Sequence, residues 1–324
     1  MTCHRFGLRR PVGGQKSGGQ SPPSKTLLLI LVLAFLQGCT PRQNSITPEG
    51  PVRRQITDDS GKAVSLAIPV NRVVSLAPNL TEIVFAVGGG DRLVGRTSYC
   101  DFPSETKAVP EVGDTLHPSL ERIIALKPQA VLVSTASQLE VFTKQLQAHD
   151  IAVFVTDPHD LEGVFRSIEK VGEILGLTEE AKQLVNTLKQ RTGMVEEKTK
   201  GAGRVRVFYQ LSAEPLYTAG RDSFVNDLIN RAGGVSVTAD VPGAWPKYSA
   251  EAALASKPDA IILPTGGSMG DSNTAVAEPL NRSPAVLNGR VYKINDDHLV
   301  RPGPRAVDGL EEMARALHPE AFKE

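Results

Sequence analysis

The chain is 324 residues long, and its 36 basic and 36 acidic side chains cancel to a formal net charge of zero. This length is sufficient for about two lobes, each with its own hydrophobic core. The balance of charge argues against a nucleic-acid-binding protein, which would show an excess of basic residues on one face.

A leader with a short apolar segment opens the chain. Residues 1–38 carry five basic residues and no acidic one, and residues 26–36 are apolar apart from Thr26. This run is far shorter than the roughly 20 residues that span a bilayer, so it predicts a signal peptide. It ends at Leu36-Gln37-Gly38-Cys39, which resembles the lipobox of bacterial lipoproteins. The resemblance implies that residues 1–38 are removed and Cys39 is lipidated. The alternative is an ordinary signal peptide followed by a chance cysteine.

Removal of the leader changes the charge and the cysteine content. The mature chain keeps 31 basic against 36 acidic residues, a net charge of −5. Cys3 leaves with the leader and Cys39 carries lipid, so Cys100 stands alone. We therefore expect no internal disulfide and no cysteine zinc cluster. Residues 39–54 contain three prolines and are predicted to form a flexible tether.

Residues 55–177 form the predicted N-terminal lobe. A hairpin is expected at 56–64, with its turn at an Asp/Ser/Gly cluster. The first helix should begin with Asn79 and Glu82 as an N-cap pair and end at Gly88. Apolar runs typical of strands cover 73–76, 130–133 and 151–155, and helical patterns cover 119–126 and 161–175.

A long helical pattern at residues 178–201 follows the first lobe. We expect Thr178 to cap it, and its apolar residues follow a 3.6-residue period. A helix of this length can cross from one lobe to another. Residues 202–324 form the predicted C-terminal lobe, with strands at 204–208, 260–263 and 291–294 and helices at 222–232 and 305–317.

One short segment of the first lobe recurs in the second. Ser119-Leu120-Glu121, Lys127-Pro128 and Ala130-Val131-Leu132 return 130 residues later as Ser249-Ala250-Glu251, Lys257-Pro258 and Ala260-Ile261-Ile262. The repeat predicts an α/β fold of two similar lobes with mostly parallel sheets, joined by a single long helix. Such folds bind ligands outside the carboxyl ends of their strands, so we expect the site between the lobes.

The sequence gives only weak signals of a catalytic site or a metal site. Gly266-Gly267-Ser268-Met269-Gly270 matches the G-x-S-x-G elbow of serine hydrolases, but a loop composition follows where the elbow requires a helix. A flexible loop is the better interpretation, with a hydrolase using Ser268 as the alternative. An inter-lobe metal site using His117, Asp297 and His298 is conceivable, but the histidines lack paired spacing. We expect no catalytic residue, no metal and no cofactor.

Several aromatic and charged residues fall on loops that follow strands. In a chain with only 5% aromatic residues, these positions predict a pocket for a large flat ligand. Rings would contact its faces, and an acid and an arginine its polar edges. The residues are Tyr99, Tyr217, Trp245, Asp297 and Arg301.

Motifs along most of the chain resemble the substrate-binding proteins of cobalamin ABC importers, a group that includes siderophore and haem receptors. They are Val73-Val74-Ser75-Leu76-Ala77-Pro78-Asn79-Leu80-Thr81-Glu82, Ser98-Tyr99-Cys100-Asp101-Phe102-Pro103, Ser119-Leu120-Glu121-Arg122-Ile123, Trp245-Pro246 and Arg301-Pro302-Gly303-Pro304-Arg305. The resemblance implies that Tyr99, Tyr217 and Trp245 line a corrinoid, with Asp297 and Arg301 near its polar periphery. The chain departs from the pattern at residues 114–117, where some cobalamin receptors have a tryptophan.

Glu121 and Glu251 have two interpretations. Each follows a serine that is a natural N-cap, and a first-turn glutamate stabilises a helix by roughly 0.3–1 kcal/mol. In the resembling group, a surface glutamate on each lobe pairs with arginines of the membrane permease. The resemblance therefore implies that these two residues also dock the protein to a permease.

The sequence as a whole predicts a monomeric, lipid-anchored solute-binding protein outside the cytoplasm, in a periplasm or on a cell surface. It would capture cobalamin or a related corrinoid between its lobes and deliver it to an ABC permease. The alternative ligand is haem or an iron siderophore. Haem would require an axial ligand, for which Tyr99, Tyr248 and His298 are available.

Overall fold

A computed structural model describes residues 53–134, 139–266 and 275–323. The predicted leader, the lipidation site Cys39 and the elbow serine Ser268 lie outside the described residues. The first described strand begins at Arg53, so the last two residues of the predicted tether belong to the folded body. Among the described helices, none combines the length and apolar character needed to cross a membrane.

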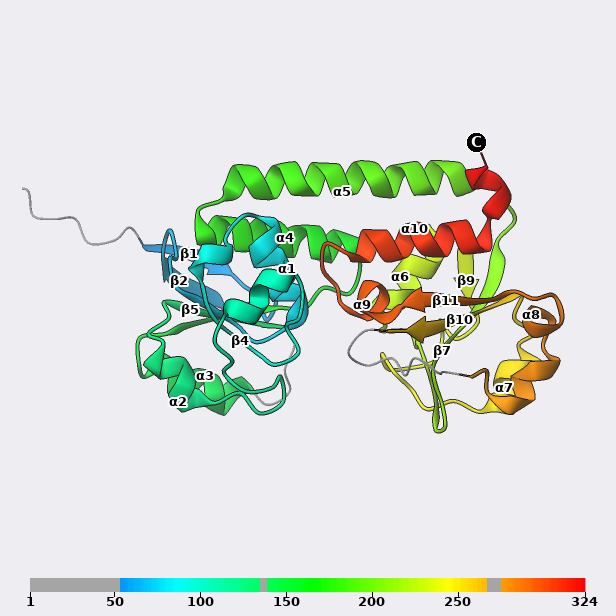
Figure 1. The fold of residues 1–324 in the computed structure, drawn as a ribbon, viewed down its shortest axis with the longest axis horizontal. Coiled ribbons are helices and arrows are strands. Elements are labelled where there is room, and N and C mark those ends of the chain that lie inside the picture. The colour runs from blue at the N-terminus through cyan, green and yellow to red at the C-terminus, as the bar shows by residue number, and fades with distance from the viewer. Residues whose placement is uncertain (1–52, 135–138, 267–274, 324) are drawn as a thin grey trace, which may run out of the picture. The chain divides into compact units, whose positions relative to one another are not determined.

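A hairpin and a four-stranded parallel sheet build the N-terminal lobe (Figure 1). The hairpin of β1 (Arg53–Thr57) and β2 (Ala63–Ala67) turns at Asp58, whose Oδ1 accepts hydrogen bonds from the backbone N–H groups of Ser60 and Lys62. This confirms the predicted hairpin. The sheet has the order β4-β3-β5-β6, formed by Leu93–Arg96, Val73–Ser75, Ala130–Ser134 and Ala152–Thr156.

Four α-helices pack in this lobe: α1 (Pro78–Ala86), α2 (Leu120–Ala125), α3 (Leu139–Gln147) and α4 (Leu161–Leu175). The predicted bounds of α4 are confirmed. The predicted N-cap of α1 is wrong, because Ala77 occupies the cap and Pro78 the first helical position. Proline suits that position because its missing N–H would have no intrahelical acceptor there. Asn79 and Glu82 lie inside the helix, free for other contacts.

Helix α5 (Thr178–Thr199) joins the two lobes and packs against α4 of the first and against α6 and α10 of the second (Figure 1). Its 22 residues span about 33 Å at 1.5 Å per residue. Thr178 is its first helical residue, so the predicted cap is wrong and Leu177 holds that place. One face of α5 buries Ala181, Val185, Leu188 and Val195.

The C-terminal lobe contains a five-stranded sheet of order β11-β10-β7-β8, with β9 also paired to β7. Only β8 is antiparallel. The strands are β7 (Val205–Ala213), β8 (Leu216–Thr218), β9 (Gly234–Ser236), β10 (Ala260–Thr265) and β11 (Val291–Asn295). The α-helices are α6 (Phe224–Arg231), α7 (Ala250–Ala255), α8 (Pro284–Leu287), α9 (Asp296–Val300) and α10 (Ala306–Leu317).

The internal repeat has a structural counterpart in both lobes. Ser119 and Ser249 each cap a six-residue helix, α2 or α7, by accepting a hydrogen bond from the backbone N–H three residues on. Lys127 and Lys257 then adopt φ values of 47° and 48°, a left-handed conformation that ends both helices before the following proline. Strands β5 and β10 follow in turn.

Alternating side chains cover both faces of each sheet. Along β5, Ala130 and Leu132 belong to one buried cluster, and Val131 and Val133 to a second on the opposite face. β10 divides its residues in the same way. The first cluster continues through α5 into both lobes, so the lobes share a core on that side. The predicted fold class, two α/β lobes joined by a long helix, is confirmed.

Candidate functional site

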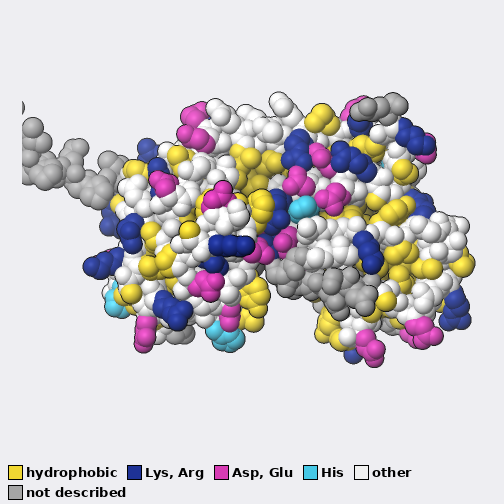
Figure 2. All heavy atoms as spheres, viewed as in Figure 1, with side chains coloured by type: hydrophobic (Ala, Val, Ile, Leu, Met, Phe, Trp, Pro, Cys, Tyr) yellow, Lys and Arg dark blue, Asp and Glu magenta, His cyan; other side chains and the backbone are white. Residues whose placement is uncertain are grey.

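Five charged residues from both lobes meet in one cluster where the lobes touch. Arg305 donates from Nε and Nη2 to the carboxylate of Glu82 at 2.9 and 2.6 Å, which joins the C-terminal lobe to α1. Arg301 lies 2.7 Å from Asp101, 3.3 Å from Glu82 and 2.9 Å from Asp297. Figure 2 shows basic and acidic side chains side by side between the lobes. Three carboxylates therefore surround two guanidinium groups.

Burial makes these charges depend on one another. The side chains of Glu82, Arg301 and Asp297 are 3, 7 and 10% exposed, whereas that of Asp101 is 52% exposed. Burial opposes ionisation of Asp101, but the hydrogen bond and charge of Arg301 outweigh it and lower its pKa. Burial also opposes the charge of Arg301 and would by itself lower its pKa. Its carboxylate partners outweigh this effect and raise the pKa of Arg301. The shifts of Asp101 and Arg301 both favour the charged forms, so each group stabilises the charge of the other.

Glu82 is the member of the cluster whose partners the sequence does not reveal. It lies in the segment Leu80-Thr81-Glu82-Ile83-Val84 of α1, in which every residue is buried. Buried carboxylates require a partner, so an acid among apolar residues of a helix was the sequence signal that could have indicated a distant basic partner. Asn79, one turn earlier, donates to the carbonyl of Pro302 at 3.2 Å. The two residues assigned to a cap instead hold the opposite lobe.

The loop after β4 carries Tyr99. The backbone N–H of Ser98 donates to the Gly113 carbonyl at 2.9 Å, and the buried Cys100 contacts the Thr97 hydroxyl at 3.2 Å. Tyr99 itself is 46% exposed. Next along the loop, the Phe102 ring is 44% exposed and lies 4.1 Å from the guanidinium carbon of Arg305. This is a cation–π contact across the lobes.

Tyr217 and Trp245 lie on neighbouring segments of the C-terminal lobe. Tyr217, on β8, pairs antiparallel with Lys247, and the Gly220 N–H donates to the Ala244 carbonyl at 3.0 Å. Trp245 lies in a bend two residues before Lys247, and its side chain is exposed.

A buried tyrosine supports Trp245. The Tyr209 ring lies 6.0 Å from the Trp245 ring at an interplanar angle of 46° and is fully buried. Burial, and secondarily the charge of Asp296, raise the pKa of Tyr209 well above its usual value. Among the described residues, no hydrogen-bond partner reaches its hydroxyl. Sequence analysis did not identify Tyr209, since it lies inside a strand with no distinguishing motif.

The unpaired hydroxyl yields a stability prediction. Tyr209→Phe keeps the ring beneath Trp245 and removes a buried group without a partner, so it should raise the free energy of unfolding by about 1 kcal/mol. Urea unfolding followed by Trp245 fluorescence measures this change. Tyr209→Leu, which removes the ring as well as the hydroxyl, is the control and should instead lower the free energy of unfolding. A clear loss of stability in Tyr209→Phe would mean that the hydroxyl does have a partner.

Helix α9 links the two groups of site residues. The sequence predicted a loop at residues 297–301, but residues 296–300 form a short helix capped by Asn295, whose side chain accepts from the Asp297 N–H at 3.0 Å. Asp296 acts on Tyr209 beneath Trp245, and Asp297 binds Arg301, which reaches the Tyr99 loop through Asp101. Adjacent residues of α9 therefore act on the two groups, Asp297 through its ion pair with Arg301 and Asp296 through its charge near Tyr209.

His117 and His298, which the sequence offered as ligands of an inter-lobe metal site, have separate partners. His117 pairs with Asp114 at 3.3 Å and is largely exposed, whereas His298 pairs with Glu312 at 2.9 Å. Throughout the described residues, no group of three or more histidine, cysteine, aspartate or glutamate side chains could hold a metal ion. Tyr248, a conceivable haem ligand, packs its ring 6.2 Å from that of Phe208.

Glu121 and Glu251 occupy equivalent exposed positions in the first turns of α2 and α7. Glu251 accepts a hydrogen bond from Ser249 Oγ at 2.8 Å. Its own backbone N–H, and then this hydroxyl, lower its pKa. Both side chains thus lie at the surface, as either capping or docking requires.

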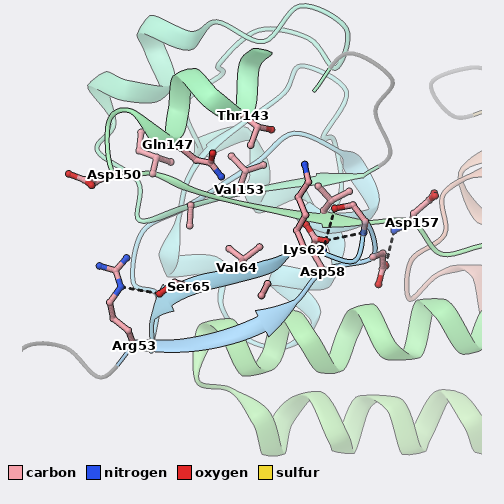
Figure 3. Close-up of a pocket in the computed structure, with 16 residues that line it drawn as sticks. Arg53, Asp58, Lys62, Val64, Ser65, Thr143, Gln147, Asp150, Val153 and Asp157 are labelled. Atoms are coloured by element: carbon pink, nitrogen blue, oxygen red, sulfur yellow. Dashed lines mark hydrogen bonds between the residues drawn. The ribbon is translucent and has the colours of Figure 1, made fainter. Parts of the chain in front are cut away.

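A separate cavity of about 830 Å³ lies in the N-terminal lobe between the β1–β2 hairpin, β6 and α3 (Figure 3). Polar side chains line much of it, and several already have partners. Asp58 holds its own turn, and Asp59 binds Lys170 at 2.6 Å and the Asp157 N–H at 2.8 Å. None of the site residues predicted from the sequence lines this cavity.

Comparisons with known proteins agree with this architecture. Residues 73–298 match the family model described as periplasmic binding protein. An uncharacterised ABC transporter substrate-binding lipoprotein of Bacillus subtilis (strain 168) is 34% identical over 310 residues, 91% of this chain and 97% of that protein. The crystal structure of a periplasmic vitamin B12 binding protein of Vibrio cholerae gives a TM-score of 0.70 at 26% identity, covering 79% of this chain and 99% of that chain. A periplasmic haem-binding protein from Roseiflexus gives 0.69 at 25% identity, covering 78% and 99%.

Proposed function

Because the chain belongs to the family of periplasmic binding proteins, we propose that it captures cobalamin or a related corrinoid outside the cytoplasm and delivers it to an ABC permease. Proteins of this family bind ligands for transport. In the proposal, the protein performs no chemistry on its ligand. Cys39 carries the lipid that keeps the protein at a membrane, in a periplasm or on a cell surface.

The proposal rests on the positions of the exposed aromatic side chains. Among the described residues, the exposed large aromatic side chains are Tyr99, Phe102 and Trp245, and all three lie on the loops predicted to form the site. Exposed rings are costly to leave in water and are expected where a flat ligand binds. Together with Tyr217 on β8, they supply apolar surface from both lobes.

In the proposed site, Asp297 and Arg301 provide the polar groups. Both are buried in the inter-lobe cluster, so their main contribution is to hold the N-terminal loop against the C-terminal lobe. In the proposal, both residues lie near the polar periphery of the corrinoid. This division leaves the rings to supply affinity and the charges to supply orientation.

Haem is the alternative ligand, and one observation favours it. Tyr99 is exposed beside the lobe junction, where its hydroxyl is available as an axial ligand for haem iron. A solved relative of similar fold binds haem. His298 is less suitable, because its side chain is only 18% exposed.

A binding experiment separates the two ligands. The purified protein is mixed with cyanocobalamin or with haemin and passed through a gel-filtration column. We expect the corrinoid absorbance to coelute with the protein, and Trp245→Ala to weaken binding by roughly tenfold or more. A Soret band that coelutes with the protein, with no retained corrinoid, would replace corrinoid by haem as the ligand.

A further inference from the structure

The loop that carries Tyr99 is held from two sides. Its own lobe fixes the first part of the loop through the Ser98 N–H bond to Gly113 and through the buried Cys100. The opposite lobe holds the part after Tyr99, because Arg301 lies 2.7 Å from Asp101. Tyr99 thus stands between an anchor in its own lobe and an anchor in the other.

The second anchor can be released without dismantling the first. Asp101 is the exposed carboxylate of the charge cluster, with 52% of its side chain accessible, whereas Glu82 and Asp297 hold Arg301 from buried positions. Loss of Asp101 therefore leaves Arg301 with charged partners, and the contact between the lobes persists through Arg305 and Glu82. The loop loses its ion pair to the opposite lobe and keeps only the ring contact between Phe102 and Arg305.

We propose that Asp101 is a positioning residue for ligand binding, which fixes Tyr99 relative to the C-terminal lobe. This inference rests on the proposed function for its ligand but not for its geometry. Asp101 acts through the loop, by holding the ring of Tyr99 at the place where a ligand between the lobes meets it. A preorganised loop binds more tightly because less conformational freedom is lost when the ligand arrives.

Backbone amide exchange tests the geometry without any ligand. In Asp101→Ala, peptides covering residues 97–104 should exchange hydrogen severalfold faster than in the wild-type protein, while the midpoint of urea unfolding falls only slightly. Asp101→Glu keeps the charge and should restore most of the protection. Asp227→Asn is the matched control, because Asp227 also crosses the lobes, accepting from the Leu161 N–H at 2.9 Å, but is remote from the loop in sequence and contact. Unchanged exchange in Asp101→Ala overturns the proposal.

Ligand kinetics provide the second readout. With cyanocobalamin as the probe, Asp101→Ala should weaken affinity roughly two- to fivefold, mainly through a faster dissociation rate, and Asp227→Asn should not. Equal dissociation rates in Asp101→Ala and wild type would also overturn the proposal. If the wild-type protein does not bind cyanocobalamin, the corrinoid assignment fails by itself, and the exchange experiment alone decides the role of Asp101.

Discussion

Replacing Glu121 and Glu251 together by arginine is expected to abolish association with the permease and to leave ligand affinity unchanged. Both carboxylates are exposed in the first turn of a short helix, one in each lobe. In Figure 1, α2 and α7 lie at the side of the lobes away from α5. A permease surface that carries arginines would meet like charge at both points, which should weaken association by at least about a hundredfold.

The control for this variant must change the charge equally at another surface. Glu179→Arg with Glu197→Arg does so on α5, where both glutamates are exposed and pair with lysines one turn on. Binding of each variant to the cognate permease in nanodiscs, and to the free ligand, gives both affinities. Normal association of the Glu121/Glu251 variant would leave these residues with the capping role alone. Equal loss in the α5 variant would indicate a general effect of net charge.

Glu82→Gln is expected to cost about 3 kcal/mol of unfolding free energy. The substitution removes a 3% exposed carboxylate that faces Arg301 and Arg305, and so leaves two buried guanidinium groups with less negative charge around them. Breaking one side of a buried ion pair typically costs about 3–5 kcal/mol. Asp101 and Asp297 still face the arginines, which places the effect at the lower end of that range.

Urea unfolding at neutral pH measures this cost. Glu311→Gln is the matched control, since Glu311 also binds a guanidinium group, that of Arg191, at 2.9 Å, but both side chains are more exposed. Its loss should be about 1 kcal/mol or less. A loss below about 1 kcal/mol in Glu82→Gln would show that the inter-lobe cluster does not stabilise the fold. Replacing the whole cluster by apolar residues should cost less than the single substitution.

Most of the fold could be predicted from the sequence because its elements carry local signals. The helix at Leu161–Leu175 has a capping aspartate, an apolar stripe and a terminal glycine, and its predicted bounds are those observed. The hairpin has its turn residues in order, and the repeat around Ser119 and Ser249 revealed two equivalent lobes. Each of these signals arises within a few residues, so no knowledge of distant contacts was needed.

The candidate site could be predicted only in part. The loop that carries Tyr99 follows β4, as predicted, but Tyr217 lies in strand β8 where the sequence predicted a loop. Two helix caps were assigned wrongly, at Asn79 and at Thr178. The spacing of Asn79 and Glu82 is typical of a helix cap, but both side chains instead contact the other lobe. A rule based on neighbouring residues cannot show that a polar side chain has a partner so far away in the sequence.

Local sequence patterns were sufficient to predict the two α/β lobes and the long helix between them, and the ligand-binding loops remain a prediction. Only the tertiary structure decided that Glu82 meets Arg301 and Arg305, more than 200 positions later in the chain. It also decided that Tyr209 supports Trp245 and that Asp101 ties the Tyr99 loop to the opposite lobe. The physical reason is that secondary structure depends on neighbours within a few residues, whereas the partner of a buried charge or ring depends on how whole lobes pack.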